Sequence, residues 1–331
     1  MRCANHRKKA LPRISRLGPG PLAATLLSSS LLVLLLGSLA SSLGGLASAA
    51  QAPLPSGRIT APPSASAAEL SVPGGWFRMG SRPEDLRAVL AELGEREGRG
   101  ALRRQLLLFL QEELPERRIH LGPYRIDRLE VTRAAYDGCV RRGPCKAVAA
   151  PSTLGAFSRP DAPMVNVTWE EAGVYCRYVG KRLPTEAEWE KAARGPFGRV
   201  WPWGPKWQEK ACNHGTLHPV HSMFHLSASD GFLWVAPVGS FPGDRSYYGV
   251  MDLAGNVAEW VADWYQPGWW TRGPVPAHAP RGPSGGNGRL IKGGSFSRLR
   301  ILSRPAAKRL LLASEQRAGD VGFRCARDLR R

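Results

Sequence analysis

The sequence is poor in acidic residues: 27 Asp and Glu stand against 46 Lys and Arg, which gives a formal net charge of +19. Such an excess indicates nucleic-acid binding where basic and aromatic side chains are interleaved, and no such motif is present. Six of the basic residues lie among the first fifty, and removing them from +19 leaves +13. We therefore predict no nucleic-acid partner and attribute the remaining charge to solubility and attraction to anionic surfaces.

The first fifty residues contain no acidic side chain at all. A basic segment precedes an apolar run at 22–46, and Ala47, Ser48 and Ala49 form a small-residue pattern typical of signal-peptide cleavage. The run is long for a signal peptide, so an uncleaved membrane anchor is the alternative, but Ser and Gly within the run make it a poor membrane span. We predict a signal peptide at 1–50, a Pro-, Ser- and Ala-rich linker at 51–70, and a periplasmic or secreted protein.

Cysteine is scarce, with six in the chain and one of these in the predicted signal peptide. The other five would enter an oxidising compartment, where pairing is favoured. Cys139 and Cys145 enclose a short loop with Gly and Pro, which suits a local disulfide. Cys176 and Cys325 could form a long-range disulfide, and Cys212 then remains as a small buried side chain.

Hydrophobic residues make up 43% of the chain and include eleven tryptophans, which predicts a packed body. A short strand is expected within 71–81, and leucines at helical spacing predict a helical insertion at 83–116. Strand-like runs return at 119–131, and Thr132 suits a helix N-cap. Two capping boxes, in which a hydroxyl and a carboxylate satisfy orphan amides reciprocally, predict two further helices. They are formed by Thr168 with Glu171 and by Thr185 with Glu188.

No EF-hand spacing is present, but two stretches offer oxygen ligands. Asp252 and Glu259 flank a glycine-containing turn whose carbonyls can face a hard cation, and that cation would neutralise the two carboxylates. Asn213 with His214 could meet Asp230 in the same way. The alternative is that these residues form turns with local Asx hydrogen bonds.

Four histidines follow one another at spacings of four, three and four residues: His214, His218, His221 and His225. On a continuous helix they would face one side and suit zinc or iron. Gly215 and Pro219 interrupt the run, so we expect a loop at 214–225 rather than a transition-metal site.

Several stretches occur in an order that resembles one known family. They are 163–195, Trp201–Gly204, Tyr248–Trp260, Lys292–Ser295 and Gly322–Cys325. Over 71–328 the chain resembles the formylglycine-generating enzyme, or sulfatase-modifying factor, family, and a match of several motifs in order is far more specific than one motif. The resemblance implies an irregular α+β fold related to C-type lectins, with little regular secondary structure and bound calcium.

The resemblance also assigns residues to two calcium sites and one disulfide. The first calcium site matches Asn213, His214 through its carbonyl, Asp230, and Phe232 through its carbonyl. The second matches Asp252, Gly255, Val257 and Glu259. The implied disulfide joins Cys176 to Cys325.

The family's catalytic centre is not retained. Enzymes of the family hold Cu(I) with two cysteines, and the matching positions here are Arg298 and Ser303, which cannot replace soft thiolates. The neighbouring tryptophan and histidine of the family are Ala258 and Leu299 here, and only Ser295 of the oxygen pocket remains. Copper is therefore not expected, and we predict a non-catalytic module that binds another envelope or secreted protein or a peptide. The alternative is an oxidase that uses iron or another metal to modify a peptide or small molecule.

Overall fold

The computed structural model describes residues 69–92, 100–152, 155–216 and 226–329. The predicted signal peptide at 1–50 lies outside the described residues, as do His218, His221 and His225 and all but two residues of the predicted linker at 51–70. Within the described ranges no helix has both the length and the apolar character needed to cross a membrane.

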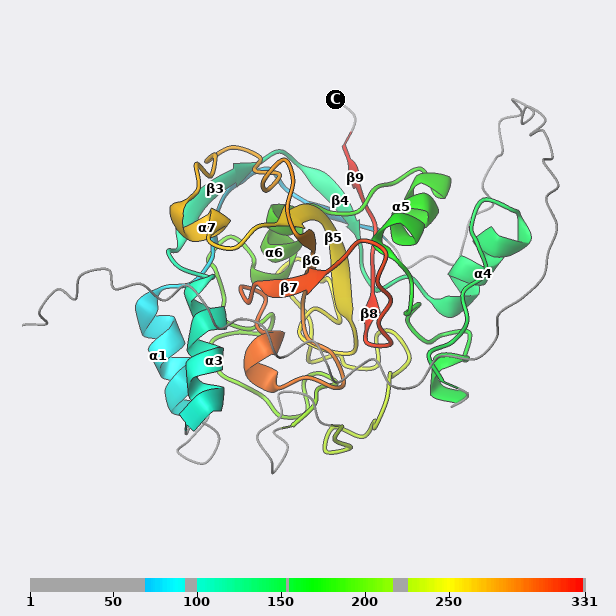
Figure 1. Cartoon of the computed structure of the whole chain (residues 1–331), viewed down its shortest axis with the longest axis horizontal. Coiled ribbons are helices and arrows are strands. Elements are labelled where there is room, and N and C mark those ends of the chain that lie inside the picture. Colours follow the sequence, from blue (N-terminus) through cyan, green and yellow to red (C-terminus); the bar gives the residue numbers. More distant parts are fainter. Residues whose placement is uncertain (1–68, 93–99, 153–154, 217–225, 330–331) are drawn as a thin grey trace, which may run out of the picture. The chain divides into compact units, whose positions relative to one another are not determined.

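Short helices and short strands are mixed along the chain, as expected for an irregular α+β fold (Figure 1). The helices are α1 (Pro83–Glu92), α3 (Gly100–Gln111), α4 (Arg133–Arg141), α5 (Trp169–Tyr178), α6 (Glu186–Arg194) and α7 (Trp269–Arg272), with 3-10 turns η1 (Gly155–Phe157) and η2 (Arg300–Ser303). Helices α1 and α3 confirm the predicted insertion at 83–116 and lie side by side (Figure 1).

The strands form three small sheets. They are β1 (Glu69–Val72), β2 (Gly75–Met79), β3 (Arg117–Leu121), β4 (Tyr124–Asp127), β5 (Ala258–Tyr265), β6 (Gly288–Lys292), β7 (Arg309–Leu312), β8 (Val321–Gly322) and β9 (Ala326–Asp328). The strand orders are β1-β4-β9, β2-β3 and β7-β6-β5-β8. All pairs are antiparallel except β5 with β8, which runs parallel and places Glu259 beside Gly322.

The predicted threonine caps start three of the helices. Thr132 accepts a hydrogen bond from the backbone of Ala135 at the start of α4. At α5 and α6 both halves of each predicted capping box form, through Thr168 with Glu171 and Thr185 with Glu188. These local signals were readable from sequence because each partner lies three residues from the other.

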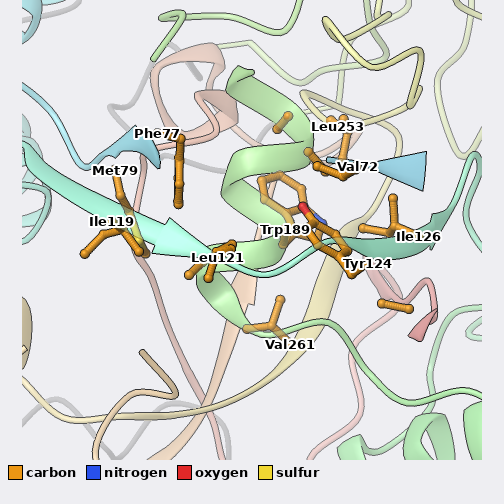
Figure 2. Close-up of a cluster of buried hydrophobic side chains, with 14 of the residues drawn as sticks. Val72, Phe77, Met79, Ile119, Leu121, Tyr124, Ile126, Trp189, Leu253 and Val261 are labelled. Carbon is orange, nitrogen blue, oxygen red and sulfur yellow. The ribbon is translucent and has the colours of Figure 1, made fainter. Parts of the chain in front are cut away.

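Helix α6 is the central element of the core, because all nine of its residues are buried. Trp189 on this helix packs among apolar side chains of β1 to β4 and β5 (Figure 2). The helix also contacts β6. Burial on all sides means that the polar residues of α6 must find partners inside the protein.

The charged side chains of α6 are paired within this core. Glu190 accepts from Lys292 on β6 at 3.0 Å and from Arg194 at 2.8 Å. Glu186 faces Lys308 at 3.1 Å, and its backbone amide donates to Asp263 at 2.7 Å. Removing one partner of such a pair would leave a buried charge uncompensated, which would strongly destabilise the fold.

The helical insertion packs on the segment that carries η2. Leucine and valine side chains of α1 and α3 form one apolar cluster with Leu299, Ile301 and Leu302. Arg304 then makes a buried, bidentate ion pair with Glu113, at the end of the insertion. The insertion therefore covers the segment to which the resemblance assigns the copper ligands.

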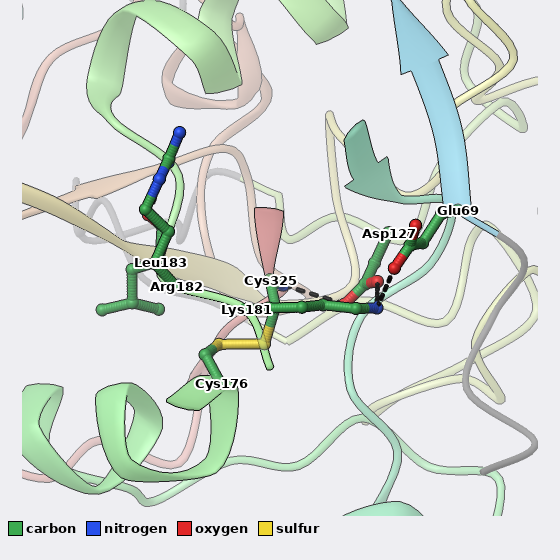
Figure 3. Close-up of a disulfide and its surroundings, with 7 residues drawn as sticks. All are labelled: Glu69, Asp127, Cys176, Lys181, Arg182, Leu183 and Cys325. Carbon is green, nitrogen blue, oxygen red and sulfur yellow. Dashed lines mark hydrogen bonds and ion pairs between the residues drawn. A yellow bond between two sulfur atoms is a disulfide. The ribbon is translucent and has the colours of Figure 1, made fainter. Parts of the chain in front are cut away.

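Both predicted disulfides are present. Cys139 pairs with Cys145, and Cys176 on α5 pairs with Cys325 before β9 (Figure 3). Close to the second disulfide, Lys181 forms ion pairs with Asp127 and Glu69. The free Cys212 is buried, as expected, and burial raises the pKa of its thiol well above the usual value.

Candidate functional site

An ion pair lies at Arg298, the residue that the resemblance assigns to the first copper cysteine. The Nε atom of Arg298 donates to Oδ2 of Asp320 at 2.7 Å, and both side chains are largely buried. The same carboxylate oxygen accepts from the hydroxyls of Ser295 at 2.9 Å and Ser297 at 3.2 Å. The family pocket is therefore a closed polar cluster centred on Asp320, a residue that sequence reasoning did not single out.

Ser303, which the resemblance assigns to the second copper cysteine, is fully enclosed. Ser303 is buried, and its hydroxyl has no hydrogen-bond partner among the residues that the structure describes. A Cβ atom on Gly294 would lie 2.0 Å from the carbonyl oxygen of Ala254 and 2.4 Å from the Ser303 hydroxyl, so only glycine fits there. Ala258 and Leu299 are buried too and offer no metal-binding atom.

Beside this pocket lies a group of aromatic side chains, which we call the tryptophan shelf: Trp201, Trp203 and Trp207. Their ring centroids are 4.6 to 5.8 Å apart. Trp201 is buried, whereas Trp203 and Trp207 are half-buried. The Arg300 guanidinium lies 5.9 Å from the Trp207 ring.

The shelf is joined to the pocket through His214 and Gly215. The His214 ring packs edge-on against Trp207 at 4.9 Å, and the amide of Gly215 donates to the carbonyl of Arg298 at 2.9 Å. Pocket and shelf thus form one continuous region, with apolar ring surface beside two arginines.

The structure brings together the residues of the first candidate calcium site. Asp230 accepts from the amide of His214 at 2.8 Å and from that of Phe232 at 2.9 Å. The second of these contacts is a local Asx hydrogen bond, as expected if these residues form a turn. Asn213 donates through Nδ2 to the Trp234 carbonyl at 2.9 Å.

One atom of this site favours a cation. The side chain of Asn213 is fully buried, and its Oδ1 has no hydrogen-bond partner among the described residues. A buried amide oxygen without a partner is costly, and amide and carboxylate oxygens are ligands that calcium prefers. The donor set at Asn213 and Asp230 therefore fits Ca²⁺.

The second candidate site differs from the expectation that a metal neutralises its carboxylates. Arg324 donates to both oxygens of Glu259, at 2.6 and 2.7 Å, and Trp189 donates to Oε2 at 2.9 Å. Arg324 also contacts the carbonyls of Met251 and Asp252 at 2.9 and 3.4 Å. The charge of Glu259 is thus already balanced by a buried arginine.

Two further carboxylates, Glu130 and Asp244, lie beside Asp252 and were missed by sequence reasoning. Burial raises the pKa of Glu130 well above its usual value, and the Asp252 charge adds to this. Burial, followed by the charge of Asp252, raises the pKa of Asp244 to about 8. Glu130 Oε1 and Asp244 Oδ1 lack hydrogen-bond partners among the described residues, so either a cation or a proton would stabilise these buried oxygens.

Backbone contacts join the two candidate calcium sites. The carbonyl of Asn213 accepts from the amide of Asn256 at 2.8 Å, and a Cβ atom on Gly255 would lie 2.2 Å from that carbonyl oxygen. Val257 is buried next to them. Gly255 is therefore required for this close approach, whether or not its own carbonyl binds a metal. Within the described ranges, no three His, Cys, Asp or Glu side chains form a metal-ligating group.

Comparisons with known proteins agree with the motifs. The model of a family described as the sulfatase-modifying factor enzyme 1-like domain matches residues 57–329. The formylglycine-generating enzyme of Thermomonospora curvata is 41% identical over 185 residues, which is 51% of this chain and 57% of that protein. The inactive C-alpha-formylglycine-generating enzyme 2 of Mus musculus is 35% identical over 182 residues, which is 52% of this chain and 51% of that protein.

The solved structure of PvdO from Pseudomonas aeruginosa superposes with a TM-score of 0.59 at 25% identity, and covers 79% of this chain and 94% of that one. This likeness agrees with the irregular α+β fold. The chain spans about half the length of the curated relatives it matches.

Proposed function

We propose that this chain, which belongs to the family of the sulfatase-modifying factor enzyme 1-like domain, is a non-catalytic binding module of an exported protein. In this proposal the half-buried rings of the tryptophan shelf bind a peptide segment of another envelope or secreted protein, and the closed polar cluster at Arg298 supports the loops beneath them. Calcium stabilises the loops that carry them.

The observation that carries the proposal is the ion pair of Arg298 with Asp320, 2.7 Å apart. The resemblance assigns the Arg298 position to a copper thiolate. Arginine is a fixed cation without an acceptor atom, so it opposes a metal ion at this point. Ser303 offers only a neutral hydroxyl, which is a poor ligand for Cu(I).

The helical insertion supports the same conclusion. Its leucines pack on Leu299, Ile301 and Leu302, and Arg304 is held by Glu113. Opening a copper pocket at Arg298 and Ser303 would require this buried segment to move, which breaks apolar packing and a buried ion pair. The segment 299–304 is therefore held in place by packing and an ion pair, and it is not arranged as a metal-binding loop.

The tryptophan shelf supports a binding role. Half-buried Trp203 and Trp207 expose ring surface, and Arg300 lies against Trp207. Tryptophan and arginine are the side chains that contribute most to protein interfaces, because they combine large apolar area with hydrogen-bond donors. An extended peptide would contact the rings of Trp203 and Trp207 and the neighbouring guanidinium of Arg300.

The test for catalysis is mass spectrometry of a Cys-X-Pro-X-Arg peptide incubated with protein supplied with Cu(I). We expect no formylglycine above a no-protein control, while the formylglycine-generating enzyme of Thermomonospora curvata serves as the positive control. Turnover by this chain would overturn the proposal and assign it an oxidase activity. The double variant R298C/S303C should remain inactive, because Ala258 and Leu299 still replace two residues of the family pocket.

The test for binding is selection of phage-displayed peptides on the purified protein, followed by affinity measurement of one selected peptide. Trp207→Ala should weaken binding of that peptide at least about tenfold, since truncating a tryptophan at the centre of an interface commonly costs about 2 kcal/mol or more. Phe197→Ala is the matched control, because Phe197 is an aromatic residue that is 72% exposed and belongs to neither pocket nor shelf. Equal affinity for the wild type and Trp207→Ala would contradict a binding role for the shelf.

A further inference from the structure

Two histidines that are far apart in sequence face each other at the edge of β3. His120 lies on β3, directly opposite Trp76 of β2. His278 lies in the segment after α7 and pairs with His120 in a parallel bridge. The three ring centroids form a triangle whose sides are all 5.2 Å.

The backbone fixes this arrangement. The amide of His120 donates to the carbonyl of Ala277 at 2.7 Å, and the amide of Ala279 donates to the carbonyl of His120 at 2.9 Å. These bonds hold the two histidine backbones side by side before any ligand binds. Preorganisation of this kind lowers the entropy cost of binding.

The imidazole rings have the spacing that one metal ion requires. Zinc–nitrogen bonds of about 2.0–2.1 Å at a tetrahedral angle place two ligating imidazole centroids roughly 5 Å apart. The observed separation of His120 and His278 is 5.2 Å. Among the residues that the structure describes, neither ring makes a hydrogen bond, so their nitrogens are available as ligands.

We propose that His120 and His278 form a surface site for a divalent transition-metal ion such as Zn²⁺, Ni²⁺ or Cu²⁺. Water completes the coordination, because His278 is exposed and His120 is half-buried. Trp76 closes one side of the site. Imidazole nitrogen suits these ions, whereas calcium and magnesium prefer oxygen.

The surroundings limit the strength of binding. The Arg118 guanidinium lies 5.3 Å from the Trp76 ring, and its fixed charge opposes a dication. Two protein ligands also hold an ion less tightly than the three or four of zinc enzymes and structural zinc sites. The site therefore takes up metal reversibly rather than holding a permanent ion. It is independent of the pocket at Arg298 and of the proposed calcium sites.

The experiment is calorimetric titration of the metal-free, full-length protein with Zn²⁺ in buffer with excess calcium. The quadruple variant H6A/H218A/H221A/H225A is the background, which leaves His214 as the one histidine besides the tested pair. His214 is buried, and its ring nitrogens lie 2.9 and 3.1 Å from the backbone carbonyls of Gly215 and Glu209. In this background we expect one binding event, which His120→Ala and His278→Ala each weaken at least about tenfold, the range seen even for outer-shell substitutions. Ni²⁺ should quench Trp76, so that Trp76→Phe loses the quenching and keeps the heat of binding.

Thermal melting checks that the variants are folded, and His278→Ala should melt as the parent does because the side chain is exposed. Zinc binding that is unchanged in both His120→Ala and His278→Ala would overturn the proposal. So would the absence of any Zn²⁺ binding in the background protein.

Discussion

Arg324 and Glu259 form an ion pair in which both side chains are buried. Arg324 donates as well to the backbone carbonyls of Asp127 and Arg128, at 3.2 and 3.1 Å. One guanidinium therefore joins β4 and β5 to the C-terminal segment. A buried ion pair adds little to the free energy of unfolding compared with an apolar pair of similar volume. Losing only one partner, however, lowers that free energy strongly.

Arg324→Met should lower the free energy of unfolding by about 3–5 kcal/mol, because Glu259 is left buried and charged without a partner. The double variant R324M/E259Q should recover part of this loss, since glutamine is neutral and still accepts the hydrogen bond from Trp189. Urea unfolding of the four proteins measures both effects. Additive losses in the double variant would contradict direct coupling between the two side chains.

Asp263 is a second buried carboxylate with a structural role. It accepts the amide of Glu186 at the first position of α6, at 2.7 Å. Burial, and after it the charge of Glu186, raises the pKa of Asp263 to about 7. Because the folded pKa is raised above the ordinary value of 3.8, the native state holds more protons than the unfolded state between these values.

Asp263 should therefore make the protein less stable as the pH rises from about 4 to about 7, and the loss should be constant above that window. Asp263→Asn keeps an acceptor for the Glu186 amide but cannot ionise. Its stability relative to the wild type should rise across the window by roughly 4 kcal/mol. Urea unfolding at several pH values measures the difference.

Asp161→Asn is the control, because this carboxylate is 62% exposed and surface substitutions change stability by little. A difference between Asp263→Asn and wild type that does not vary with pH would contradict the raised pKa of Asp263.

At the scale of elements, the two disulfides tie the chain together over very different spans. Cys139 and Cys145 are 6 residues apart, next to the end of α4. Cys176 on α5 and Cys325 before β9 are 149 residues apart. In the chain-entropy model a disulfide stabilises by restricting the unfolded chain, and the effect grows with the enclosed length.

Replacing both cysteines of a pair by alanine should therefore cost more for Cys176 and Cys325, about 5 kcal/mol, than for Cys139 and Cys145, about 2 kcal/mol. Thermal and urea unfolding of the two double variants gives the comparison. Peptide mapping without reduction is the accompanying check. Finding Cys176 and Cys325 as free thiols in the wild-type protein would rule out the long-range disulfide.

At the scale of the whole molecule, loops rather than strands carry most of the proposed calcium ligands. The two sites touch through Asn213, whose carbonyl accepts from Asn256. Glu130 lies just after β4 and Asp244 in the loop before β5, so one cation would hold several distant segments together. Their buried, unpartnered oxygens need a positive charge or a proton.

Removing calcium with a chelator should lower the melting temperature by several degrees, because a ligand bound only to the native state stabilises it in proportion to RT ln(1 + [L]/Kd). Re-addition of calcium should restore the melting temperature. Asn213→Ala should reduce the chelator effect, while Asn166→Ala is the control because Asn166 lies outside both sites. An unchanged melting curve, together with no calcium in elemental analysis of the purified protein, would contradict structural calcium.

The sequence by itself determined the features whose partners are close together or belong to a recognisable motif. Each capping box of α5 and α6 joins two residues that are three positions apart, so its hydrogen bonds follow from local spacing. The leucines of the insertion repeat at helical spacing. The order of the motifs indicated the family, and with it the fold and the disulfide of Cys176 with Cys325.

Only the tertiary structure decided which charges meet inside the protein. Arg324 is 65 residues from Glu259, and Asp320 is 22 residues from Arg298, so neither pairing follows from local spacing. His278 meets His120 because β3 pairs with the segment after α7. Pairing of this kind depends on how the whole chain folds back on itself, because buried charges take the partner that folding places within reach.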